Sequence, residues 1–178
     1  RFAAGKSVLN MFGYTGGFSV YAARAGATLV HTVDSSAPAI AMATRNMQLN
    51  GFGGPEYECI VADARKYIET MGQDQYDLVV LDPPAYAKNV ASRNQALKGY
   101  RTLNALALAK IKSGGILFTF SCSQVVDRQM FTSAVTAAAI DAGRQVRIIQ
   151  HLSQPADHPI NIFHQEGEYL KGLVLMVD

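Results

Sequence analysis

Cys122 lies where a thiol can act as a nucleophile, because it directly follows an apolar run, Ile116-Leu-Phe-Thr-Phe-Ser121, that is typical of a buried strand. Asp82 ends another such run and precedes two prolines, and a glycine-rich turn, Gly13-Tyr-Thr-Gly-Gly17, follows the first run of the chain. In an open α/β sheet, ligands bind outside the carboxyl ends of the strands. We therefore expect a thiol, a carboxylate and a tight backbone turn to meet in one crevice.

The elements that would hold these residues can be traced from the hydrophobic pattern. Short β-branched or aromatic runs alternate with helical stretches, which predicts an α/β fold with a parallel sheet covered by helices on both faces. The run at residues 77–81 is continuously apolar, as expected of a central strand. The predicted strands are residues 7–12, 29–33, 57–62, 77–81, 116–120, 146–151 and 169–177, and the predicted helices are residues 18–25, 36–50, 64–71, 94–112 and 127–142.

Composition is typical of one compact domain. The 178 residues are 49% hydrophobic and 17% charged, which suits a sizeable core and argues against disorder. No apolar stretch approaches the ~20 residues of a membrane span and no signal-like segment opens the chain, so we expect a cytoplasmic protein without a membrane partner. Two cysteines, Cys59 and Cys122, without zinc-type spacing predict reduced thiols and no metal site.

Basic residues are concentrated in one part of the chain, although the net charge is only +2. Residues 83–126 contain no Asp or Glu, which suits a surface that binds a polyanion such as RNA. Ordinary solvated helix faces are the alternative. The basic side chains in this stretch are Lys88, Arg93, Lys98, Arg101, Lys110 and Lys112.

Several motifs occur in a fixed order along the chain. They are Val8-Leu-Asn-Met-Phe-Gly-Tyr-Thr-Gly-Gly17, Val33-Asp34, Ala62-Asp63, Asp82-Pro-Pro84 and Phe120-Ser-Cys-Ser123. This set resembles class I S-adenosylmethionine-dependent methyltransferases over nearly the whole chain. More narrowly, the motif around Cys122, with Ala156-Asp-His-Pro159 and Glu168-Tyr-Leu-Lys-Gly172 downstream, resembles the bacterial large-subunit (23S) ribosomal RNA cytosine-C5 methyltransferase family.

The resemblance implies a Rossmann-like, mostly parallel sheet of seven strands with helices on both faces and an antiparallel C-terminal strand. It also implies that residues 1–178 form a catalytic domain that uses S-adenosylmethionine, releases S-adenosylhomocysteine and acts on ribosomal RNA. The chain opens at Arg1 without a methionine. We therefore expect that the RNA-binding domain typical of this family precedes it in a longer protein; the oligomeric state stays open.

The cofactor residues can be justified by their chemistry. Glycines allow the backbone to turn tightly and approach a ligand, and the following helix presents free N–H groups to a carboxylate, which suits the methionine end of the cofactor. Asp34, at a strand end, suits the ribose hydroxyls. Asp63 resembles the family position that contacts the adenine amino group, and each acid has helix capping as its alternative role. The predicted cofactor contacts are Asn10, Phe12, Tyr14, Thr15, Gly16, Gly17, Asp34, Ser35, Asp63, Ala64 and Asp82.

The thiol has a specific use in cytosine chemistry. Cytosine C5 is a poor nucleophile, and addition of a thiolate to C6 makes C5 electron-rich until a base removes its proton and the sulfur leaves. We assign that thiolate to Cys122, with Asp82 as the second catalytic residue at the N3 and N4 edge of the base. The position of Cys122 ahead of a helix, within the acid-free stretch, predicts an ionised thiol. The alternative is a buried cysteine that packs as a small hydrophobe, which is how we interpret Cys59.

The remaining predicted substrate contacts surround this pair. Tyr86 would stack on an extruded base, with ordinary packing as its alternative. A second cysteine, which many RNA cytosine-C5 methyltransferases carry in the fourth-strand motif, is absent here, so another base must release the product: His158, Asp157 or water. The predicted substrate contacts are Pro83, Pro84, Tyr86, Lys88, Arg101 and His158.

Three other functions stay open from the sequence. Methylation at guanine N7 or an exocyclic amine needs no nucleophile, although Ala85 separates the prolines from the aromatic residue that usually follows them in amino-group methyltransferases. A catalytically silent RNA-binding module would need only the basic surface. An NAD-dependent enzyme fits less well, because the turn lacks the regular Gly-x-Gly-x-x-Gly spacing.

Overall fold

A seven-stranded sheet forms the centre of the computed structural model, which describes residues 2–164 and 167–178. The strands are β1 (Ser7–Met11), β2 (Leu29–Asp34), β3 (Tyr57–Val61), β4 (Leu78–Leu81), β5 (Ile116–Ser121), β6 (Val146–Leu152) and β7 (Lys171–Val177). Their order in the sheet is β3-β2-β1-β4-β5-β7-β6. Strands β1 to β5 are parallel to one another and β7 is antiparallel to both β5 and β6, which confirms the predicted fold. Arg1, the residue on which the predicted upstream domain was based, lies outside the described residues.

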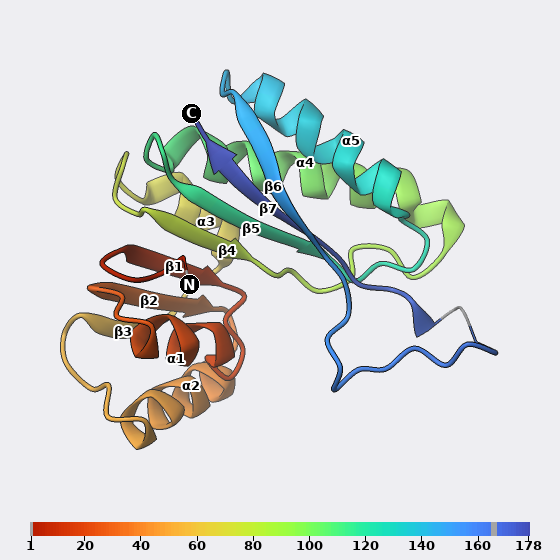
Figure 1. Ribbon diagram of the computed structural model, residues 1–178. Coiled ribbons are helices and arrows are strands. Elements are labelled where there is room, and N and C mark those ends of the chain that lie inside the picture. The colour runs from red at the N-terminus through yellow and green to blue at the C-terminus, as the bar shows by residue number, and fades with distance from the viewer. Residues whose placement is uncertain (1, 165–166) are drawn as a thin grey trace.

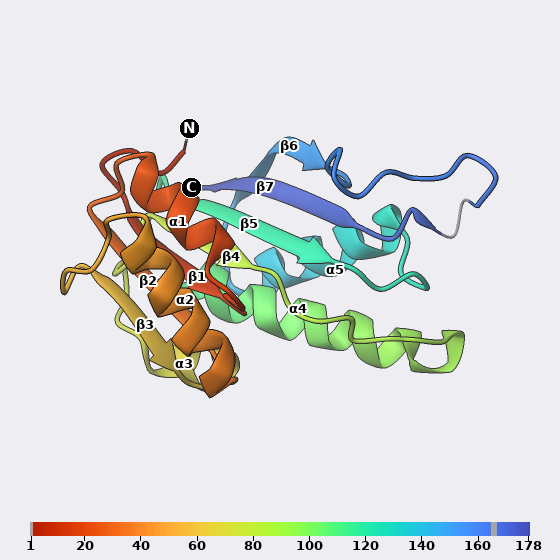
Figure 2. The ribbon, with the colours of Figure 1, turned by 90° about the horizontal axis from the view of Figure 1, so that it is seen from below.

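Helices cover both faces of this sheet, as Figures 1 and 2 show. Helices α1 (Gly17–Arg24) and α2 (Ala37–Leu49) lie on one face, and α3 (Ala64–Thr70), α4 (Arg93–Lys110) and α5 (Arg128–Asp141) lie on the other. A short 3-10 helix, Val90–Ser92, leads into α4. Among the described residues, no helix is long and apolar enough to span a membrane.

Alternation of side chains along the strands divides the core into two layers. In β1, Leu9 and Met11 pack in the layer of α3, α4 and α5, whereas Val8 packs in the layer of α1 and α2. All four residues of β4 are buried, as the continuous apolar run predicts. Strand β4 lies between β1 and β5, and helices cover both of its faces, so it is buried on every side. Asp82, which follows it, lies in the middle of the sheet edge.

The carboxyl ends of the parallel strands meet at one edge, and two long connections leave the sheet there. One runs from Asp82 to α4, and the other joins β6 to β7 and extends away from the domain in both views (Figures 1 and 2). At the opposite edge, Asp77 joins the start of β4 to the start of β1. Its Oδ2 accepts hydrogen bonds from the Ser7 amide at 2.8 Å and the Ser7 hydroxyl at 2.7 Å, and Oδ1 accepts one from Lys112 Nζ at 3.0 Å.

Acid stability should depend on Asp77. Burial opposes ionisation of this carboxyl, but the hydrogen bonds from Ser7 and Lys112 outweigh it and lower the pKa to about 2, below the model-compound value of 3.8. A lowered pKa stabilises the fold above pH 3.8, and this contribution is lost as the pH falls through about 2. In urea titrations between pH 4 and pH 2, we expect wild type to lose about 1 kcal/mol more unfolding free energy than Asp77→Asn, allowing for partial solvent exposure.

Asp74→Asn is the matched control, because it neutralises an exposed carboxylate three residues earlier in the same connection. It should keep the acid dependence of wild type. Identical acid dependence in wild type and Asp77→Asn would show that the Asp77 contacts contribute nothing to the folded state.

Candidate functional site

The turn after β1 is held in a conformation that few residues tolerate. Phe12 and Tyr14 have φ values of 58° and 45°, and Gly16, the N-cap of α1, has φ 81°. Positive φ is costly for a residue with a side chain and persists where the surrounding structure enforces it. A Cβ added at Gly13 would overlap the Thr32 methyl group, and one at Gly16 would lie 3.1 Å from Ala43 Cβ. The turn therefore brings backbone close to β2 and α2.

A buried cluster of polar side chains from β1, α1 and β2 supports the turn after β1. Asn10 is 1% exposed, and its Nδ2 donates to Ser19 Oγ at 2.9 Å. Ser19 Oγ and Thr32 Oγ1 lie 2.6 Å apart and share a hydrogen bond. At the far side, Asn46 Nδ2 donates to the Thr15 carbonyl at 2.8 Å. The predicted cofactor contacts Asn10 and Thr15 thus have observed roles as supports of the turn, and their contact with a ligand stays a prediction.

Asp34 joins the turn after β1 to the segment between β2 and α2. Its Oδ2 accepts from the Tyr14 amide at 3.1 Å, and its Oδ1 accepts from the Ser36 amide at 2.8 Å, across the exposed Ser35. Helix α2 is capped by Ser36, whose Oγ accepts from the Ala39 amide at 3.3 Å. Asp34 therefore does not cap α2. Each carboxylate oxygen keeps a lone pair for a ligand hydroxyl.

Asp63 has the capping role that the sequence left open, and its contact with adenine stays a prediction. Its Oδ1 accepts from the Lys66 amide at 2.9 Å and caps α3. It also lines a hollow of about 370 Å³, which we call the Asp63 hollow, between the ends of β1 and β3 and helix α4. Residues that line the Asp63 hollow include Phe12, Asp63, Ala64, Tyr86, Gly99 and Leu103.

Tyr86 belongs to this hollow and not to the one that holds Cys122. Its ring centroid lies 4.8 Å from that of Tyr100, and burial raises its pKa to about 12. Gly99 permits this packing, since a Cβ there would lie 2.9 Å from Tyr86 Cδ2. The structure thus places Tyr86 beside Phe12 and Asp63, on the side of the predicted cofactor contacts.

Cys122 lies at the end of β5 in a second hollow of about 290 Å³, the Cys122 hollow. The side chain is partly buried, and its Sγ lies 3.8 Å from the carbonyl oxygen of Pro83. Pro83 is buried and Pro84 exposed. The predicted contact Lys88 lines this hollow as well, so the structure brings Cys122, Pro83 and Lys88 together. The lining residues are Ala85, Ala87, Lys88, Cys122, Gln124 and Tyr169.

The serines on either side of Cys122 are structural anchors. Ser121 and Ser123 are both fully buried. Ser123 Oγ accepts from the Ala87 amide at 3.3 Å and lies 2.9 Å from the Tyr100 hydroxyl, with which it shares a hydrogen bond. One serine therefore ties the end of β5 to the Asp82–α4 connection and to α4 itself, which fixes the position of the thiol.

Burial and the charge of Asp82 act against ionisation of the Cys122 thiol. Burial raises the pKa of the Asp82 carboxyl. Burial and the negative charge of Asp82 also raise the pKa of the Cys122 thiol, although a backbone hydrogen bond and Lys171 oppose them. The prediction of an ionised thiol is therefore wrong for the free protein. The sequence did not reveal that the thiol is partly buried, nor that Asp82, distant in sequence, raises its pKa in the fold.

Two predicted substrate contacts lie apart from the Cys122 hollow. Arg101 lines a separate groove between α4 and α5 and pairs with Asp141 through two hydrogen bonds of 2.6 Å. His158 is exposed on the β6–β7 connection, where its Nδ1 lies 3.4 Å from Asp157 Oδ1. Acids from outside residues 83–126 thus neutralise part of the basic stretch: Asp141 pairs with Arg101, and Asp77 pairs with Lys112.

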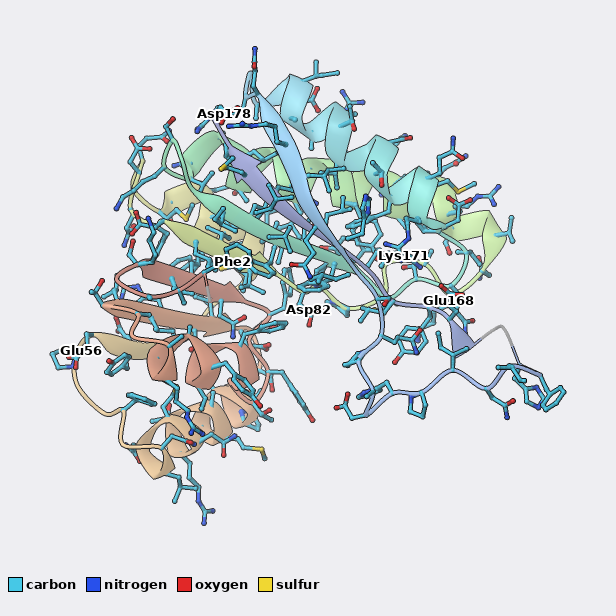
Figure 3. The ribbon with its side chains drawn as sticks, in the orientation of Figure 1. Phe2, Glu56, Asp82, Glu168, Lys171 and Asp178 are labelled. Atoms are coloured by element: carbon cyan, nitrogen blue, oxygen red, sulfur yellow. The ribbon has the colours of Figure 1, made fainter. Side chains whose placement is uncertain are left out.

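Tyr169 and Lys171 were not assigned a role from the sequence, although both belong to a motif that it singled out. Tyr169 lines the Cys122 hollow, and Lys171 Nζ donates to the Ser123 carbonyl at 2.7 Å. Figure 3 shows Lys171 and Asp82 at the same edge of the sheet. A lysine directly before the apolar run Gly172-Leu-Val-Leu-Met-Val177 was the available signal, because a buried charge is rare without a partner.

Comparison with known proteins agrees with this geometry. The sequence profile of the S-adenosylmethionine-dependent methyltransferases matches residues 1–162. The chain belongs to this family. Its relatives include "Ribosomal RNA large subunit methyltransferase I" of Shewanella amazonensis, 45% identical over 99% of this chain, and the protein of the same name from Aeromonas hydrophila, 42% identical over 98%. The chain spans 45% of the length of each relative.

Solved structures of methyltransferases share the fold. SMU.776, whose crystal structure was determined with S-adenosylhomocysteine, superimposes with a TM-score of 0.84 over 98% of this chain and 46% of its own, at 24% identity. Trm5b from Pyrococcus abyssi has a TM-score of 0.70 over 98% of this chain and 45% of its own, at 20% identity.

The residues of this methyltransferase fit S-adenosylmethionine. The first turn of α1 has neither a side-chain cap nor an acidic residue, so its N–H groups are available to the methionine carboxylate. Asp34, whose Oδ2 accepts from the Tyr14 amide, would hold the ribose hydroxyls, and the Asp63 hollow, which has an aromatic wall and a carboxylate, would hold the adenine ring. When bound, the cofactor supplies a methyl group on a sulfonium, which is an electrophile.

Gly13→Ala should weaken cofactor binding, because the added methyl group overlaps Thr32 and displaces the turn. We expect a loss of at least about tenfold in S-adenosylmethionine affinity by calorimetry and of about 1–3 kcal/mol in unfolding free energy. Gly17→Ala is the control for stability, since a Cβ there meets no atom within 4 Å. Unchanged affinity in Gly13→Ala would contradict the placement of the cofactor on this turn.

Proposed function

We propose that this methyltransferase domain transfers a methyl group to C5 of a cytidine in large-subunit ribosomal RNA through a covalent bond to Cys122. The names of the 42–45% identical relatives support the RNA class. The observation that carries the cytosine-C5 assignment is the thiol itself. It opens into a hollow beside Pro83 and Lys88, at the carboxyl ends of the parallel strands, where we also predict the cofactor contacts.

The chemistry follows from the positions of two side chains. Cys122 adds its sulfur to C6, which opens the C5=C6 double bond and leaves an electron pair at C5 for attack on the sulfonium methyl group. The raised pKa of Asp82 favours its neutral form, which can donate a hydrogen bond to N3 of the ring. A neutral Asp82 also removes the negative charge that opposes the Cys122 thiolate.

Release of the product needs a proton acceptor for C5. When the C5 proton is transferred to this acceptor, its bonding electron pair restores the C5=C6 double bond and the sulfur of Cys122 leaves C6 as a thiolate. His158 and Asp157 are exposed, and neither is among the described residues that line the Cys122 hollow. The candidate acceptors were His158, Asp157 and water, and we therefore propose water.

Lys88 supplies the phosphate contact in this proposal, since it is exposed at the rim of the Cys122 hollow. Arg101 contributes less, because its guanidinium group already pairs with Asp141. Tyr86 serves the adenine side of the site, in agreement with its place in the Asp63 hollow.

Large-subunit ribosomal RNA transcribed with 5-fluorocytidine tests the covalent step. Fluorine at C5 cannot leave as a proton does, so the adduct persists after methyl transfer. We expect a protein–RNA band that survives denaturation in wild type and in Cys59→Ala, and its complete loss in Cys122→Ala. Mass spectrometry of digested ordinary RNA should detect 5-methylcytidine with wild type and Cys59→Ala, but not with Cys122→Ala.

Two results would replace the proposal with another function. Methylated RNA from Cys122→Ala would indicate chemistry without a covalent intermediate, at guanine N7 or an exocyclic amine. RNA binding by wild type without any methyl transfer, in the presence of bound S-adenosylmethionine, would indicate a silent RNA-binding module.

A further inference from the structure

Lys171 contacts the chain on both sides of Cys122. It is the first residue of β7 and lies opposite Ser121 in the antiparallel register with β5. Its Nζ donates to the Ser123 carbonyl and to the Tyr169 carbonyl, each at 2.7 Å. Lys171 thus lies opposite Ser121, which precedes the thiol, and donates a hydrogen bond to Ser123, which follows it. It also donates to Tyr169, which lines the Cys122 hollow.

The burial of this ammonium group calls for an explanation. Lys171 is 7% exposed, and no ion pair joins it to a carboxylate in residues 2–164 and 167–178. Burying a charge is costly unless it is paired and hydrogen-bonded. The two carbonyls satisfy two of the three N–H groups but supply no opposite charge.

We propose that Lys171 is a positioning residue for Cys122: its ammonium group fixes the Ser121–Ser123 turn and stabilises the thiolate that attacks the base. The proposal rests on the proposed function, because only a covalent mechanism needs that thiolate. It explains the buried charge, since the missing anion forms when Cys122 ionises.

The other charged groups around the pair come from three segments. Asp82 and Lys88 belong to the connection between β4 and α4, Asp127 and Arg128 lie at the start of α5, and Glu168 precedes β7. Burial lowers the pKa of Lys171, and the charge of Cys122 raises it. Lys171 in turn lowers the pKa of Cys122, against burial and Asp82. The coupling between the two groups is reciprocal, as linkage requires.

Alkylation of the thiol by iodoacetamide as a function of pH tests the coupling without RNA or cofactor. Cys59→Ser provides the background, because Cys122 is then the only thiol. In this background, Lys171→Met should raise the midpoint of the alkylation profile by about one pH unit, so that alkylation at pH 8 slows about tenfold. Lys171→Arg keeps the charge and should restore most of the shift.

Lys6→Met is the matched control, since Lys6 is exposed next to the start of β1, at the opposite edge of the sheet. It should leave the midpoint unchanged. The proposal would be overturned if the midpoint of Lys171→Met lay within 0.2 pH units of this control. That tolerance corresponds to about 1.6-fold in the thiolate fraction. A change in the alkaline plateau alone would also overturn the proposal, because the plateau reports access to the thiol rather than its ionisation.

A second measurement keeps Lys171 in place and decides the question if Lys171→Met does not fold. The ¹³Cε resonance of Lys171 is titrated in Cys59→Ser and in Cys59→Ser/Cys122→Ser. We expect the Lys171 midpoint to fall by about one pH unit when the thiol is replaced, by reciprocity; an unchanged midpoint would overturn the proposal. Coupling without a 5-fluorocytidine adduct in wild type would instead refute the proposed function and leave the electrostatic coupling between Lys171 and Cys122 established.

Discussion

The antiparallel register of β5 and β7 decides what surrounds the thiol. Ser121 lies opposite Lys171, and the pairing continues to Ile116 opposite Met176. Because successive side chains of a strand point to opposite faces, a slip of one residue would turn Lys171 away and expose the apolar side chains of β7. The packing of Leu173, Leu175 and Val177 in the layer of α5 prevents that slip. The hydrophobic core and the chemistry of the site are thus set by one pairing.

The turn after β1 shows how the fold offsets local strain. Two residues with side chains take positive φ there, at a cost of order 1–3 kcal/mol each. Their backbone is held by Asp34, by the cluster of Asn10, Ser19 and Thr32, and by Asn46. These supports come from β1, β2, α1 and α2, so the conformation exists before any ligand arrives. A preformed turn binds a ligand without the entropic cost of ordering it.

Much of this arrangement is readable in the sequence because it is encoded locally. Apolar runs end at Asp34, Asp82 and Ser121, and the chain breaks at glycines and prolines, so each predicted strand end lies within two residues of the observed one. The functions assigned to the residues at these ends stay predictions. Contacts between distant segments could not be read from the sequence. Arg101 pairs with Asp141, 40 residues later, and the ionisation of Cys122, which was predicted wrongly, depends on Asp82 and Lys171, 40 and 49 residues away. The carboxyl of Asp63 caps α3 and also lines a hollow, so its predicted contact with adenine and its capping role do not exclude each other.

Opposing charges at the sheet edge give the thiol a conditional reactivity. In the free protein, burial and the charge of Asp82 hold the pKa of Cys122 above its ordinary value. A thiol kept protonated reacts slowly with solvent oxidants and other electrophiles, because the thiolate is the reactive form. The balance changes when Asp82 takes up a proton or shares one with the base, since its opposition disappears while the ammonium of Lys171 stays. In the proposed scheme the nucleophile is generated only where a base occupies the site: burial and Asp82 protect the thiol in the free protein, and Lys171, held by its pairing with β5, supports the attack on the base.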